Sequence, residues 1–200
     1  MRSTNKLCFG TSDRNKKCAF AVYCIGMFSK LPTTRKGTIA ERYVRDLLVS
    51  RGWHIYTYSA DQSHPVDMLA ITPQNQLVGV EVKCKCARIY YPDTGIDHKD
   101  YYGYHNFEMV VGVPILLLFV DHQQRSVYGN YLDKLSQPLT IVDNKRELVY
   151  PMITDQYVYF PLQLMEHYAD IPPAIVAQLI VRTHSKYHHP LPTTTDDDGV

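Results

Sequence analysis

Apolar residues recur three and four positions apart in the segment that follows residue 37, which is the spacing of one face of an α-helix. Thr38 is a suitable N-cap residue, and Gly52 lies where a left-handed C-cap is required. The pattern predicts a helix that begins at Thr38 and ends before Gly52. Its apolar face consists of Ala40, Tyr43, Val44, Leu47 and Leu48.

After this helix the chain changes to short runs rich in β-branched and aromatic residues, which predict strands. Residues 54–58 form the first run. Residues 66–71 and 77–86 flank a polar turn and predict a β-hairpin. Residues 115–120 and 126–131 predict a further strand pair, and residues 139–150 predict another hairpin. Pro172 and Pro173 open a predicted C-terminal helix.

Residues 87–108 combine many tyrosines with proline and glycine and predict a long ordered loop that could include a short helix. The order of helix, strand, hairpin and further strand predicts an α/β fold with helices covering a mixed central sheet. We divide the chain into an N-terminal extension of unknown role (1–34), a core (35–135), a C-terminal strand and helix region (136–186) and a disordered tail (187–200).

The composition of the 200 residues is that of an ordinary globular protein with a formal net charge of +1. Nucleic-acid binding would therefore depend on local clusters of charge. The five cysteines have irregular spacing, which favours a reducing, cytoplasmic environment and argues against a zinc site. The apolar residues 18–28 lack a cleavage site and are too short to span a bilayer, so we expect a soluble intracellular protein without a membrane partner.

The stretch Val-Glu-Val-Lys-Cys-Lys-Cys at residues 80–86 contains the candidate catalytic residues. In a strand, Glu81, Lys83 and Lys85 share one face and the apolar residues share the other. The hairpin brings Asp67 to the same end of the sheet. Two carboxylates, with the carbonyl oxygen of Val82 as a further ligand, can hold Mg²⁺, which lowers the pKa of a bound water. A neighbouring lysine can orient that water or stabilise charge on a phosphate.

The residues Gly37-x-x-x-Glu41, Asp67 and Glu81-x-Lys83 resemble the PD-(D/E)XK nuclease superfamily, and their layout is most similar to Holliday junction resolvase-like members. The resemblance covers residues 37–120 and departs at Pro65, which is displaced from its usual place directly before the aspartate. It implies a restriction-endonuclease-like fold and Mg²⁺-dependent or Mn²⁺-dependent cleavage of DNA, in preference to RNA.

The same resemblance implies individual roles. Asp67 and Glu81 would bind the metal, Glu41 would contribute to that site, and Lys83 would act on the attacking water or the phosphate. Similar enzymes also suggest a homodimer and a structure-selective or nicking endonuclease of a phage or mobile element.

Each assignment has an alternative. Glu81 and Lys83 could form the solvated face of an edge strand, Glu41 could complete a capping box with Thr38, and Asp67 could be a turn residue. The chain could also be a catalytically inactive nucleic-acid-binding or protein-interaction module. A further set could contact phosphate or simply be polar surface: Lys36, Arg42, Ser63, Lys85 and Arg88.

Overall fold

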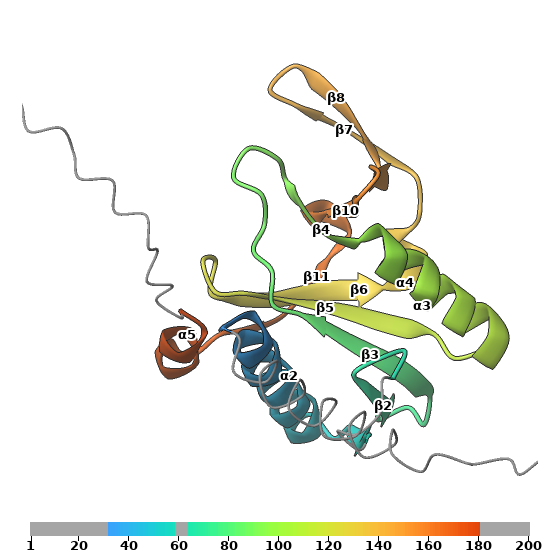
Figure 1. The fold of residues 1–200 in the computed structure, drawn as a ribbon, viewed down its shortest axis with the longest axis vertical. Coiled ribbons are helices and arrows are strands. Elements are labelled where there is room, and N and C mark those ends of the chain that lie inside the picture. Colours follow the sequence, from blue (N-terminus) through green and yellow to red (C-terminus); the bar gives the residue numbers. More distant parts are fainter. Residues whose placement is uncertain (1–31, 59–63, 181–200) are drawn as a thin grey trace, which may run out of the picture.

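A six-stranded sheet forms the centre of the computed structural model, which describes residues 32–58 and 64–180 (Figure 1). The strand order is β1-β2-β3-β5-β6-β11, in which β3 and β5 run parallel and all other neighbours run antiparallel. The strands are β1 (His54–Thr57), β2 (Met68–Ile71), β3 (Leu77–Lys83), β5 (Ile115–Asp121), β6 (Ser126–Tyr131) and β11 (Glu166–Asp170). The predicted mixed central sheet is confirmed.

Helices cover both faces of this sheet. One face packs against α2 (Pro32–Ser50) and α5 (Pro173–Leu179), and the other packs against α3 (His98–Val111) and α4 (Leu132–Leu135). Strand β5 is buried along its whole length: Leu116 and Leu118 face the α2 side, whereas Leu117 and Phe119 face the α3 side. Burial on both faces explains its uninterrupted apolar sequence, and each such side chain contributes about 1.5–3 kcal/mol.

Two small sheets extend the α3 side. One has the order β4-β10-β9, from β4 (Asp93–Asp97), β10 (Tyr157–Pro161) and β9 (Met152–Ile153), and a short 3₁₀ helix, η1 (Leu162–Leu164), follows β10. The other is the hairpin of β7 (Leu139–Asp143) and β8 (Arg146–Tyr150), which confirms the hairpin predicted at 139–150. Because β11 is an edge strand of the central sheet and Leu179 of α5 lies in the core, the C-terminal segment contributes to the same core; the division at residue 136 stays a prediction.

Helix α2 begins earlier than predicted. It starts at Pro32, and the hydroxyl of Thr38 donates to the carbonyl of Thr34 within the helix at 3.1 Å. Thr38 is therefore not an N-cap, and the capping-box explanation of Glu41 is wrong. The predicted apolar face is confirmed because Ala40, Val44 and Leu48 are buried, and Gly52 adopts φ 82° just after the helix as predicted.

The segment predicted as a loop at 87–108 contains β4 and most of α3, so that prediction is wrong. Asp97 stands at the N-cap position of α3 and Gly112 at its C-cap with φ 71°, while Tyr101 and Tyr104 enter the core. The predicted extension of β3 to residue 86 is also wrong. The chain turns away after Lys83, where the N–H of Lys85 donates to the carbonyl of Lys83 at 3.0 Å.

The expectations for residues 1–31, for Ser63 and for the tail at 187–200 lie outside the described residues. Within the part of the chain that the structure describes, no helix is long and apolar enough to cross a membrane.

Candidate active site

The β2–β3 hairpin brings Asp67 and Glu81 together, as the sequence predicted. Its register pairs Met68 with Val80, so Asp67, one residue before β2, lies beside Glu81. The backbone N–H of Asp67 donates to Oε2 of Glu81 at 3.2 Å, and the N–H of Val82 donates to Oδ2 of Asp67 at 2.8 Å. These two hydrogen bonds fix both carboxylates on the backbone of one hairpin.

Lys83 lies on the same face of β3 as Glu81, as strand alternation predicted. Its Nζ is 2.9 Å from Oε1 of Glu81 and 2.8 Å from Oδ2 of Asp100. Burial opposes the charge of Lys83, but the neighbouring Glu81 carboxylate, Tyr104 and the hydrogen bond to Asp100 outweigh it and raise the pKa of the lysine. Lys83 is thus an ammonium held between two carboxylates.

Helix α3 supplies two residues that the sequence analysis did not identify. The hydroxyl of Tyr104 donates to Oε1 of Glu81 at 2.5 Å, and Asp100 accepts the bond from Lys83. Burial, followed by the charge of Glu81, raises the pKa of Tyr104, so this hydroxyl remains protonated and donating. Asp97 and Gly112 at the two helix ends were the available sequence signal for α3.

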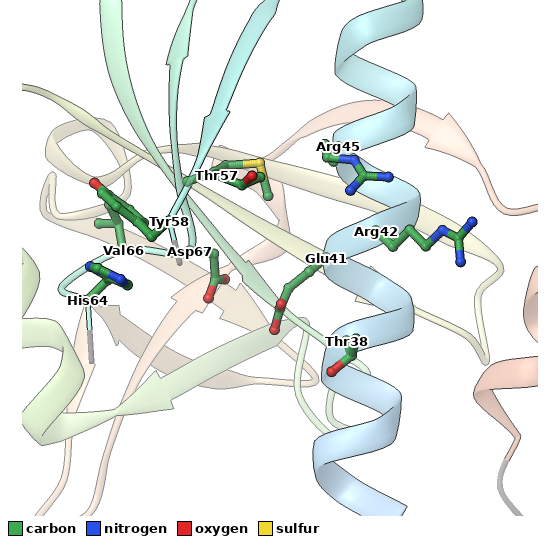
Figure 2. Close-up of a pocket in the computed structure, with 10 residues that line it drawn as sticks. Thr38, Glu41, Arg42, Arg45, Thr57, Tyr58, His64, Val66 and Asp67 are labelled. Atoms are coloured by element: carbon green, nitrogen blue, oxygen red, sulfur yellow. The ribbon is translucent and has the colours of Figure 1, made fainter. Parts of the chain in front are cut away.

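Glu41 projects from α2 toward Asp67 at the end of the hairpin (Figure 2). Burial and then the charge of Glu81 raise the pKa of Glu41 above its usual value. Burial, Glu81 and Glu41 together raise the pKa of Asp67 to about 7, against the lowering effect of the Val82 N–H and Lys83. The three carboxylates therefore repel one another, and a cation at this point would relieve that repulsion.

A pocket of about 500 Å³ opens in front of Glu41 and Asp67. Arg42 and Arg45 of α2 lie on one side of it, and the His64 ring lies on the other, stacked on Tyr58 with ring centroids 3.9 Å apart (Figure 2). Arginine guanidinium groups are well suited to phosphate oxygens. The complete lining is Thr38, Glu41, Arg42, Arg45, Thr57, Tyr58, His64, Val66, Asp67 and Met68.

The other residues predicted to bind nucleic acid lie at the edge of this site or away from it. Lys85 follows β3 and pairs with Asp97 at 3.2 Å. Arg88 is further along the chain, where both of its bonds to Asp93 measure 2.6 Å. Lys36 lies nearer the start of α2. Burial raises the pKa of the Cys84 thiol just after β3, and the positive charge of Lys36 opposes this shift. Their contacts with nucleic acid stay predictions.

The donor set fits Mg²⁺. Among the described residues, no three aspartate, glutamate, histidine or cysteine side chains form a group that could hold a metal by itself. Mg²⁺, however, is usually bound by one or two carboxylates and keeps several waters, with the remaining positions left to substrate phosphates. The adjacent oxygens of Asp67 and Glu81 match that requirement better than they would match a cation that needs a full protein cage.

No family model and no curated protein matches the chain. Among solved structures, the chain is similar to Hjc, a Holliday junction resolvase from the archaeon Archaeoglobus fulgidus, with a TM-score of 0.43 and 12% sequence identity. The similarity covers 64% of this chain and 90% of that chain.

Proposed function

We propose that the protein is a Mg²⁺-dependent nuclease that hydrolyses phosphodiester bonds of DNA. The observation that supports it best is the mutual fixing of Asp67 and Glu81 by backbone N–H groups, with the ammonium of Lys83 beside them. Burying charges in a strand is costly unless they are paired, and here one lysine accompanies several carboxylates. Such a surplus of oxygen ligands is what a divalent cation requires.

Each residue has a role in this proposal. Asp67 and Glu81 would hold the metal, with the carbonyl oxygen of Val82 as an additional ligand, and Glu41 would contribute its negative charge to the site. When bound, the metal would polarise a phosphate oxygen and lower the pKa of a bound water. Lys83, already an ammonium, would stabilise negative charge that develops on the phosphate.

The protein's own cations would position the substrate. Arg42 and Arg45 line the pocket in front of Glu41 and can contact the phosphates that flank the scissile bond. Mn²⁺ would substitute for Mg²⁺, and a homodimer would allow both strands of a duplex to be cut.

The test is a cleavage assay on supercoiled plasmid, four-way junctions and RNA, with Mg²⁺, with Mn²⁺ and with chelator. Asp67→Asn and Lys83→Ala should abolish metal-dependent cleavage, whereas Asp46→Asn and Lys134→Ala, which change exposed residues of the same types, should not. Calorimetric titration with Mn²⁺ gives a second readout, since Asp67→Asn should lose metal binding and Lys83→Ala should keep it. A wild-type protein that binds metal but leaves every substrate intact would contradict the proposal and favour a binding module.

A further inference from the structure

The segment that leaves the catalytic strand, residues 84–92, is held rigidly although it has no regular secondary structure. We call it the β3–β4 loop. The N–H of Ala87 donates to Oδ2 of Asp121 at 2.8 Å, and the N–H of Arg88 donates to the carbonyl of Asp93 at 2.9 Å. The Arg88 guanidinium makes two bonds of 2.6 Å to the Asp93 carboxylate, which is fully buried. A buried, doubly bonded ion pair therefore fixes the conformation of this loop.

At its tip the same loop exposes large apolar side chains. Ile89 is 84% exposed and Tyr90 is 77% exposed. A single exposed apolar residue is ordinary. Two in succession, on a loop whose conformation is fixed by buried contacts, form an apolar surface that a binding partner can contact. An exposed tyrosine whose backbone is already ordered loses little entropy when another flat group stacks on it.

Residues of the loop and of the β7–β8 hairpin line an open pocket of about 420 Å³. Tyr90 and Tyr91 line it from the loop, and Arg146 lines it from the hairpin. The Arg146 guanidinium lies 5.7 Å and the Arg88 guanidinium 4.1 Å from the centroid of the Tyr91 ring. The charged residues of the lining are Arg88, Arg146 and Asp143. Because Asp93 already pairs with Arg88, Arg146 is the arginine of this lining that can contact a phosphate.

Two lysines at the end of β3 also lie beside aromatic rings, although both are paired with carboxylates and the Tyr104 ring is buried. The Lys83 ammonium lies 5.5 Å from the centroid of the Tyr104 ring, and Lys85 lies 4.9 Å from that of Tyr157. Since Tyr90 follows Lys83 by seven positions, the two lie at most about 25 Å apart. Exposed rings beside cations are typical of proteins that bind single-stranded nucleic acid, where rings stack on bases and cations follow the phosphates.

We propose that the β3–β4 loop and the β7–β8 hairpin bind an unpaired nucleic-acid strand adjoining the bond that is cut. Tyr90 stacks on a base of that strand, and Arg146 contacts its phosphates. This inference rests on the proposed nuclease function and adds to it a substrate class, namely nucleic acid with an unpaired segment. A protein partner would also use exposed apolar residues, but the Arg146 guanidinium beside Tyr91 favours a polyanion.

The experiment measures binding by fluorescence anisotropy in chelator, so that no cleavage takes place. The probes are a short labelled single-stranded DNA, an RNA of the same sequence, and the blunt DNA duplex. Tyr90→Ala should weaken binding of single strands by roughly 5- to 150-fold, because stacking on one ring is lost. Tyr90→Phe, which keeps the ring, should bind as wild type, and Arg146→Ala should reduce both the affinity and its salt dependence.

The matched control is Tyr56→Ala, which removes a 58% exposed tyrosine from the edge strand β1 that does not line this pocket and should not affect binding. Equal weakening by Tyr90→Ala and Tyr56→Ala, or no weakening by Tyr90→Ala, would overturn the inference. It is likewise overturned if Tyr90→Ala changes only self-association in analytical ultracentrifugation, because the loop is then a protein contact.

The two proposals fail separately. A wild-type protein that cuts duplex DNA but does not bind single strands refutes the unpaired-strand surface and leaves the nuclease intact. A protein that binds single strands through Tyr90 but cuts no substrate with Mg²⁺ or Mn²⁺ refutes the nuclease and supports the surface. Because Tyr90 is exposed, Tyr90→Ala should melt at the wild-type temperature, which separates lost binding from lost folding.

Discussion

Asp93→Asn offers a quantitative test of the buried ion pair that anchors the β3–β4 loop. Oδ1 of Asp93 accepts a bond from Nε of Arg88 at 2.6 Å, and Oδ2 accepts bonds from Nη2 of Arg88 at 2.6 Å and from the hydroxyl of Tyr150 at 2.7 Å. Asparagine preserves the shape of the side chain but removes its charge. It also places an NH₂ group where one oxygen accepted a hydrogen bond, so two donors face each other.

The expected magnitude follows from burial. The Asp93 carboxylate is fully buried, but the Arg88 side chain is 29% exposed and can regain water when its partner is lost. We therefore expect a loss of about 1.5–3 kcal/mol, which is the contribution of hydrogen bonds to charged groups. The pair of Lys85 and Asp97 has the same chemistry, but their side chains are 38% and 58% exposed, and such pairs contribute about 0–1 kcal/mol. Asp97→Asn is therefore the matched control for Asp93→Asn.

Urea denaturation followed by the fluorescence of Trp53 measures both variants. Trp53 is the single tryptophan of the chain and packs against the core on the α2 side. For a chain of this size, a loss of about 1.5–3 kcal/mol should also lower the melting temperature by roughly 3–12 °C. If Asp93→Asn is no less stable than Asp97→Asn, the pair of Arg88 and Asp93 does not stabilise the fold as argued.

Three further substitutions test other contacts. Tyr104→Phe keeps the buried ring but removes the hydroxyl donor to Glu81, so the free energy of unfolding in chelator should fall by about 1.5–3 kcal/mol in urea denaturation; unchanged stability would contradict this. Gly129→Ala directs its Cβ against the carbonyl oxygen of Leu117 in the adjacent strand, and thermal melting should show a clear loss of stability, whereas a wild-type melting temperature would mean that β5 and β6 can separate to accept it. Asp121→Asn tests pH dependence: burial opposes ionisation, but hydrogen bonds from Ala87 and other donors lower the pKa of Asp121. Its stabilising effect should be complete above the unfolded-state pKa of about 3.9 and disappear as the pH falls through the lower folded-state pKa, so that wild type and variant converge in acid; a difference independent of pH would contradict the assignment.

The parts of the site that could be predicted from the sequence belong to one local structure. Strand alternation places Glu81 and Lys83 on one face, and the short hairpin requires Asp67 to approach them. Both inferences need only the residues between 66 and 83, so no knowledge of the tertiary structure was necessary. Helix α2 was likewise evident from the period of its apolar residues. Its start was misplaced because threonine is a favoured N-cap residue, whereas the Thr38 hydroxyl donates to the carbonyl of Thr34 inside the helix.

The parts that could not be predicted depend on contacts between distant segments. Helix α3 contains four aromatic residues, Gly103 and two histidines, so its intrinsic helix propensity is low and its sequence is similar to that of a loop. It forms because Tyr101 and Tyr104 pack onto the sheet, which is a tertiary effect that local propensity does not include. The early end of β3 also depends on a distant contact. The N–H of Ala87 donates to the Asp121 side chain at the end of β5, so this part of the chain does not continue the strand.

The difference between the site residues that the sequence predicts and the partners that it does not predict has a physical origin. Glu81 is only 6% exposed in an apolar strand, and a carboxylate buried there must find donors somewhere in the fold. The sequence therefore required partners for Glu81 without indicating where they are. The structure supplies them from Asp67 N–H in the hairpin, from Lys83 in the strand and from Tyr104 in a helix 23 residues away. Residues that perform chemistry can be recognised because their burial is costly, whereas the residues that offset that cost are ordinary tyrosines and aspartates, which only the packing of α3 against the sheet distinguishes from the rest.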